Sequence, residues 1–135
     1  MTRRRRFLVA LAAIAVIAAG TTVAVVLSGG GGGAPSQLVS PDAFARVVTE
    51  PGVVTIDVLG PGAPSIEGTD LMIPADLLTA RRGELPQTST RLAVYCWSGH
   101  TSARAVRILH GLGYRRIVEL RGGMLAWQAS GLPLT

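Results

Sequence analysis

The sequence predicts an α/β domain with a parallel central sheet and helices on both faces, preceded by one transmembrane helix. Two observations predict the domain: β-branched runs alternate with amphipathic stretches, and Gly- and Pro-rich turns separate them. A third observation, an uncharged apolar run near the N-terminus, predicts the membrane helix. With 135 residues, the chain has room for one domain of ordinary size.

The apolar run covers residues 7–27 and contains no charged side chain. At about 1.5 Å per residue, a helix of this length crosses roughly 30 Å of hydrocarbon. Four arginines at 3–6 precede the run and predict a cytoplasmic N-terminus. We therefore expect a single-pass cell-membrane protein whose domain faces the extracytoplasmic side. An apolar core ending near residues 18–20 would instead be a cleavable signal peptide, and the domain would then be secreted.

Residues 28–37 include five consecutive glycines and predict a flexible linker with a reach of roughly 17 Å. The domain is expected to occupy residues 38–135. Four of the 13 basic residues lie before the apolar run, which leaves nine against eight acidic residues. Because the exported part is nearly neutral and has no basic stripe, nucleic acid is excluded as a partner.

The domain is expected to open with a helix. Ser-Pro-Asp at 40–42 combines an N-cap, a proline at the first helical position and an acid in the first turn. Phe44, Val47 and Val48 then fall on one face. Glu-Pro-Gly at 50–52 ends this helix.

Next comes a strand, "VVTIDV" at 53–58, which is β-branched and carries an acid at its tip. Residues 60–68 are rich in Gly and Pro and predict a loop. A brief strand at 71–73 and a short helix at 74–78 are expected to follow.

The last third of the chain alternates strand and helix twice. Strands are predicted at 91–95 and 115–120, and helices at about 102–112 and at 124–129. In the first of these helices the apolar side chains fall on one face, which exposes Arg104 and Arg107. This alternation favours a parallel sheet, in which binding sites lie beyond the carboxyl ends of the strands.

The only cysteine of the chain, Cys96, lies at such a strand end, in "VYCWSGHTSAR". It has no partner for an intramolecular disulfide, and an unpaired thiol in an oxidising compartment suggests reactivity or intermolecular pairing. A thiol with a pKa of about 8.5 reacts as a thiolate, which backbone N–H groups and a helix N-terminus favour. Gly99 lets the loop curl so that its amides converge on the sulfur. Such a loop stabilises a thiolate, a persulfide or an oxyanion without a metal.

Three segments together resemble a known family. They are the loop at Cys96, "VVTIDV", whose Asp57 matches a strand-end acid, and the tail "LRGGMLAWQASGLPL", which resembles the closing G-G-x-x-x-W…G-x-P pattern. The domain resembles a single-domain rhodanese, which implies a three-layer α/β/α fold. The resemblance implies Cys96 as the catalytic residue and Asp57 as possible support. It also implies an anion and persulfide cradle made of Trp97, Ser98, Gly99, His100, Thr101 and Ser102.

The resemblance implies a sulfurtransferase that moves sulfane sulfur through a Cys96 persulfide. The donor would be thiosulfate, a persulfide or a polysulfide, and the acceptor cyanide, a thiol or a protein. The six-residue loop fits this sulfur branch and not the phosphatase branch, whose loop is one residue longer. No cofactor is implied, and one Cys with two separated His makes no metal site.

Two positions depart from the family pattern. Thr101 stands where the loop usually has Arg, and Leu59 stands where the family has the Arg of "D-V-R". These changes predict weak thiosulfate turnover and favour a less anionic donor. Two alternatives stay open: a non-catalytic rhodanese-like binding or sensing module, and a thiol-redox protein with an external resolving thiol.

Overall fold

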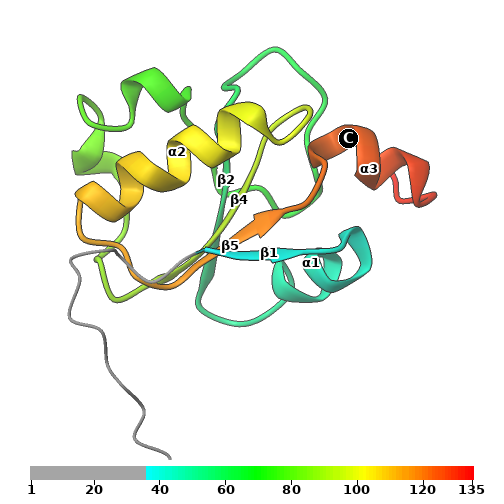
Figure 1. The fold of residues 1–135 in the computed structure, drawn as a ribbon, viewed down its shortest axis with the longest axis horizontal. Helices are drawn as coiled ribbons and strands as arrows, with labels where there is room; N and C mark the ends of the chain where they lie inside the picture. The colour runs from blue at the N-terminus through cyan, green and yellow to red at the C-terminus, as the bar shows by residue number, and fades with distance from the viewer. Residues whose placement is uncertain (1–35) are drawn as a thin grey trace, which may run out of the picture. The chain divides into compact units, whose positions relative to one another are not determined.

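A computed structural model describes residues 36–135, which fold around one five-stranded sheet (Figure 1). Every strand pair is parallel, and the strand order is β1-β5-β4-β2-β3. The strands are β1 (Gln37–Val39), β2 (Val53–Asp57), β3 (Leu71–Met72), β4 (Arg91–Tyr95) and β5 (Ile117–Leu120). The parallel sheet predicted from the sequence is confirmed.

Helices cover both faces of this sheet. They are α1 (Pro41–Val47), α2 (His100–Gly111) and α3 (Gly123–Ala129), with 3₁₀ turns η1 (Ala75–Leu77) and η2 (Arg82–Glu84). In Figure 1, α2 lies above the sheet and α1 below it. Two separate apolar clusters fill the spaces between the layers, one including α2 and η1 and the other including α1 and α3. The predicted three-layer α/β/α arrangement is therefore confirmed.

Strand β4 lies in the middle of the sheet, so its side chains are buried on both faces. Leu92, Ala93, Val94 and Tyr95 are each fully buried. Because side chains alternate along a strand, Leu92 and Val94 enter the α2 cluster, whereas Ala93 and Tyr95 enter the other cluster. Cys96 continues the alternation and also belongs to the α2 cluster. Its side chain is thereby placed on the α2 side of the sheet.

Several predicted elements agree with the structure closely. The Ser40 hydroxyl accepts a hydrogen bond from the Ala43 N–H at 3.4 Å and caps α1, whose Phe44 and Val47 are buried. β4 has the predicted bounds. α2 begins at His100, two residues earlier than predicted, because Gly99 precedes it in a left-handed conformation.

Two elements were not predicted. β1 is a three-residue strand that pairs only with β5, and its first residue, Gln37, lies inside the predicted linker 28–37. A strand this short shows too little alternation to be recognised in a sequence. The turn η2 was also not predicted. β5 begins at Ile117, two residues later than expected.

The predicted membrane helix at 7–27 and most of the predicted linker lie outside the described residues. Within residues 36–135, none of the helices combines the length and the apolar character that a membrane crossing requires.

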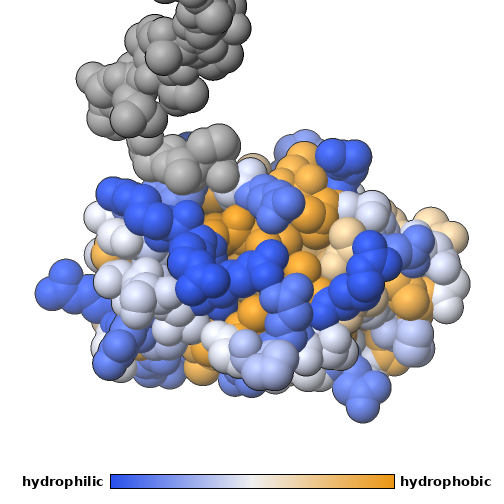
Figure 2. All heavy atoms as spheres, turned by 90° about the horizontal axis from the view of Figure 1, so that it is seen from below, coloured by the Kyte–Doolittle hydropathy of each residue, from blue (hydrophilic) through white to orange (hydrophobic). Residues whose placement is uncertain are grey.

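The surface of the domain is mixed in character. Figure 2 views the side that carries β1 and α1 in Figure 1, and shows apolar surface bordered by hydrophilic side chains. The large apolar side chains that remain exposed are Leu38, Met72, Leu77, Trp97 and Leu125. Of these, Trp97 and Leu125 come from adjoining segments, since the Leu125 N–H donates to the Trp97 carbonyl at 3.1 Å. These two exposed residues therefore lie where α3 meets the cysteine loop.

Candidate functional site

The sulfur of Cys96 accepts two backbone hydrogen bonds from its own loop. The Gly99 N–H donates to Sγ at 3.0 Å, and the Ser102 N–H donates at 3.2 Å. The Cys96 side chain is 1% exposed, so both contacts lie inside the protein. The expected convergence of loop amides on the sulfur is thus present, and both bonds strengthen when the sulfur carries a negative charge.

The sulfur also completes the N-terminus of α2. Gly99 is the N-cap, with φ of 101°, and has no side chain that could accept a hydrogen bond from the first turn. Cys96 Sγ takes this place by accepting the Ser102 N–H, which is otherwise left without a partner at a helix start. The partial positive charge of the helix start therefore lies beside the sulfur.

The backbone of the loop is held from behind by α3. The Met124 N–H donates to the Cys96 carbonyl at 2.9 Å, and the Leu125 N–H donates to the Trp97 carbonyl. Gly123 makes this close approach possible, because a Cβ there would lie 2.5 Å from both the Cys96 and Trp97 carbonyl oxygens. The G-G pattern of the tail therefore fixes the position of the cysteine loop.

The other predicted loop residues lie around the sulfur with different exposures. Trp97 is 40% exposed, Thr101 is half-buried, and Ser102 is fully buried. The Ser98 hydroxyl lies 3.1 Å from His100 Nδ1. The structure therefore brings all six predicted cradle residues into one turn, with only the amides of Gly99 and Ser102 bonded to Sγ.

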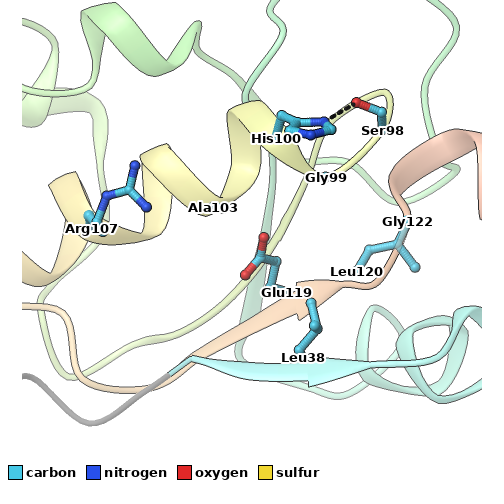
Figure 3. A pocket seen from close by; sticks show the side chains of 9 residues that line it. All are labelled: Leu38, Ser98, Gly99, His100, Ala103, Arg107, Glu119, Leu120 and Gly122. Carbon is cyan, nitrogen blue, oxygen red and sulfur yellow. Dashed lines mark hydrogen bonds between the residues drawn. The ribbon is translucent and has the colours of Figure 1, made fainter.

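A hollow of about 480 Å³ lies between α2 and strands β5 and β1 (Figure 3). Its lining combines loop, helix and strand residues: Leu38, Ser98, Gly99, His100, Ala103, Arg107, Glu119, Leu120 and Gly122. Cys96 is absent from this lining, so the hollow borders the loop without opening onto the sulfur.

Asp57, the predicted supporting acid, lies at the end of β2 and is fully buried. Its Oδ1 accepts the Leu59 N–H at 2.9 Å. Burial raises the pKa of the Asp57 carboxyl, and hydrogen bonds from the backbone N–H groups of Leu59 and Gly60 partly oppose this rise. In the described part of the chain Asp57 has no hydrogen bond to residues 97–102. The structure therefore places Asp57 outside the cradle. There its carboxylate accepts a hydrogen bond from the backbone that follows β2.

Arg104 does not supply the cation that Thr101 lacks. Its guanidinium forms an ion pair with Asp76 on η1, and both side chains are exposed. Among residues 36–135, no three His, Cys, Asp or Glu side chains come close enough to share a metal ion. The two hydrogen bonds that Cys96 Sγ accepts both come from backbone N–H groups.

Sequence reasoning missed Glu119, which is 6% exposed and whose Oε1 lies 2.8 Å from the Ser102 hydroxyl. The signal was an acid between Val118 and Leu120 in an otherwise apolar strand. A buried carboxylate needs hydrogen bonds, but the sequence does not show which groups provide them.

Comparison with known proteins agrees with this geometry. Residues 41–130, two thirds of the chain, match the family model described as a rhodanese-like domain. The chain belongs to the rhodanese-like family. A protein named sulfurtransferase from Allochromatium vinosum is 31% identical over 101 residues, which cover 73% of this chain and 94% of that protein.

Solved rhodanese structures share the fold. A rhodanese-related protein from Thermoplasma volcanium superposes with a TM-score of 0.63 at 26% identity, covering 73% of this chain and 97% of that one. A thiosulfate sulfurtransferase from Pseudomonas aeruginosa superposes with a TM-score of 0.58 at 25% identity, covering 77% of this chain and 20% of that one. The fold and the sulfurtransferase family of this rhodanese domain are thus established.

We predict that Gly123→Ala destabilises the protein far more than Gly131→Ala. Both glycines have positive φ, 62° and 77°, so each alanine variant loses about 1–2 kcal/mol to backbone strain. A Cβ at Gly131 meets nothing within 4 Å, whereas one at Gly123 collides with two carbonyl oxygens. The collision should remove about 2 kcal/mol more. Equal losses in free energy of unfolding, measured in urea, would contradict this contact.

We also predict a pH-dependent effect of Asp57→Asn. Burial holds the pKa of Asp57 above its ordinary value of 3.8, so the native protein binds more protons than the unfolded chain at pH values between 3.8 and the raised pKa. Wild-type stability should therefore fall as pH rises through this window, whereas the neutral Asn avoids the loss. The free energy of unfolding of the variant relative to wild type should rise as the pH increases above about 4. A constant difference would show that Asp57 is not desolvated.

Proposed function

We propose that this rhodanese domain is a sulfurtransferase that carries sulfane sulfur on Cys96. The single observation that carries the proposal is the pair of N–H groups, from Gly99 and Ser102, directed at Cys96 Sγ. A cysteine used only for packing does not require two donors at its sulfur, because a thiol is a weak acceptor. A thiolate gains more from them, because hydrogen bonds to a charged acceptor are stronger.

The proposed reaction has two displacements. The Cys96 thiolate attacks the outer sulfur of a donor such as thiosulfate, the S–S bond of the donor breaks, and sulfite leaves with the electron pair. The enzyme then holds a Cys96 persulfide anion. An acceptor such as cyanide or a thiolate attacks the outer sulfur, and Cys96 leaves as a thiolate. Dividing the transfer in this way is covalent catalysis.

We propose a persulfide or polysulfide as the preferred donor. Thr101 provides no cation in the loop, and Arg104 is paired with Asp76 on the outer side of α2. Neither Thr101 nor Arg104 would therefore help to bind a thiosulfate dianion, whereas a less charged donor loses less hydration on binding. Thiosulfate turnover should be correspondingly weak.

A second candidate is a non-catalytic binding or sensing module. It is favoured by the burial of Cys96, which is 1% exposed in this conformation. Sulfur transfer needs a donor to reach Sγ, so the catalytic proposal requires the atoms that cover Sγ to move aside during turnover. The following experiment distinguishes the two candidates.

We expect one sulfur atom to be added to the chain when the reduced protein is incubated with a polysulfide, and less with thiosulfate. Intact-mass spectrometry measures the addition, and subsequent cyanide should remove the sulfur as thiocyanate. Cys96→Ser should show no addition, because the chain contains no other thiol. Ser89→Ala is a matched control, because Ser89 is exposed and precedes β4, at the end of the strand opposite Cys96. A wild-type protein that takes up no sulfur would favour the non-catalytic module.

We further propose that residues 7–27 anchor the protein in the cell membrane with the domain outside the cytoplasm. The arginines at 3–6 and the uncharged run that follows support this orientation. Protease added to spheroplasts of a bacterial host should release the domain from the full chain. In a variant with glutamates at 3–6, the protease should release less of the domain, because the basic residues that keep the N-terminus in the cytoplasm are lost. Full protection of the wild-type domain would contradict the orientation, and a mature chain starting after residue 20 would show a cleaved signal.

A further inference from the structure

We propose that Glu119 is a positioning residue of the sulfur cradle and acts through Ser102. The proposal rests on the proposed role of Cys96 in sulfur transfer. It assigns a function to a buried acid that touches neither Sγ nor the loop backbone, and it explains why this acid interrupts an apolar strand.

Ser102 contacts the sulfur through its backbone and Glu119 through its side chain. Its N–H donates to Cys96 Sγ at 3.2 Å, and its hydroxyl lies 2.8 Å from Glu119 Oε1. The residue is fully buried, so water does not replace either partner. The position of the N–H relative to the sulfur is therefore tied to the position of the carboxylate.

The same hydroxyl also reaches the second N–H donor of the cradle. Ser102 Oγ lies 3.1 Å from the Gly99 carbonyl oxygen, and the Gly99 N–H donates to Sγ. Because a serine hydroxyl has one proton to donate, the Gly99 carbonyl and Glu119 Oε1 compete for it, and the contact with the carboxylate at 2.8 Å is the shorter of the two. Displacing Ser102 would disturb both hydrogen bonds to Sγ at once.

Glu119 is itself held from two sides. It is 6% exposed, its Oε1 contacts Ser102, and its Oε2 accepts a hydrogen bond from the Ser36 hydroxyl at 3.3 Å. Within the residues that the structure describes, no arginine forms an ion pair with it. Figure 3 shows its carboxylate directed from β5 toward α2, beneath Ala103. A carboxylate kept in such a place without a cation depends on its hydrogen bonds.

Packing alone does not explain an acid at this position. Ile117, the β5 residue on the same face of the sheet as Glu119, is apolar and buried in the α2 cluster, so a leucine at 119 would suit a merely structural role. His100 and Arg107 line the same hollow as the carboxylate. The test must therefore separate the hydrogen bonds of Glu119 from its charge.

Glu119→Gln and Glu119→Leu provide this separation, because both remove the charge and only Gln retains hydrogen-bonding groups for Ser102. The readout is the rate of alkylation of Cys96 by iodoacetamide in the purified full chain at about pH 7, which reports the reactive thiolate. The single cysteine makes this readout specific. We expect Glu119→Leu to react about tenfold more slowly than Glu119→Gln, which corresponds to about one buried hydrogen bond.

Sulfur transfer from polysulfide to cyanide supplies a second readout. Glu119→Leu should lower kcat about tenfold relative to Glu119→Gln, with KM for the donor unchanged within about twofold, because Glu119 does not contact the donor. Ser102→Ala should resemble Glu119→Leu, and the double variant should be no slower than the slower single variant. Such non-additivity is expected when two residues act as one unit.

Glu67→Leu is the matched control for the loss of a carboxylate, because Glu67 is exposed and lies away from the cysteine loop. Thermal unfolding identifies any variant that fails to fold, and Ser102→Ala then carries the test in place of Glu119→Leu. Equal alkylation rates for folded Gln and Leu variants would overturn the proposal, as would additive effects in the double variant. If wild type alkylates normally but takes up no sulfur, the proposed function fails while the alkylation comparison still decides the role of Glu119.

Discussion

The contact between Cys96 Sγ and the first turn of α2 is the constraint on which the rest of the site depends. Alternation along β4 places Cys96 on the α2 side of the sheet, and the left-handed Gly99 starts the helix directly beside it. The sulfur then accepts the Ser102 N–H that a helix start would otherwise leave unpaired. Strand, turn and helix therefore place positive partial charge at one atom without any ionised side chain.

Helix α3 holds the loop on its other side. Both the N–H groups and the carbonyl groups of the loop therefore form hydrogen bonds. Amide N–H groups face the sulfur, while the carbonyls of Cys96 and Trp97 accept from the N–H groups of Met124 and Leu125. Gly123 allows the two backbones to approach closely. This arrangement explains why a segment nearly thirty residues further along the chain belongs to the same motif as the cysteine.

Burial and hydrogen bonding act together at Cys96. Low local polarity strengthens each N–H···S contact, since water does not compete for the donors. The same burial restricts the molecules that reach the sulfur. A cradle built from main-chain groups, with Thr101 in place of a cation, stabilises negative charge without attracting a particular anion from solution. The rhodanese-like fold thus directs two N–H groups at the sulfur through its backbone alone.

The sequence by itself determined the parallel α/β fold, the bounds of β4, the cap of α1 and the position of Cys96 at a strand end, because these follow from side-chain periodicity and local turn chemistry. Tertiary structure decided the rest. β1 is too short to carry a pattern, and its place beside β5 depends on pairing across the sheet. The partners of Asp57 and Glu119 likewise became known only once strands distant in sequence were adjacent. Hydrogen bonds between buried polar groups depend on distance in space, which periodicity along a chain does not encode.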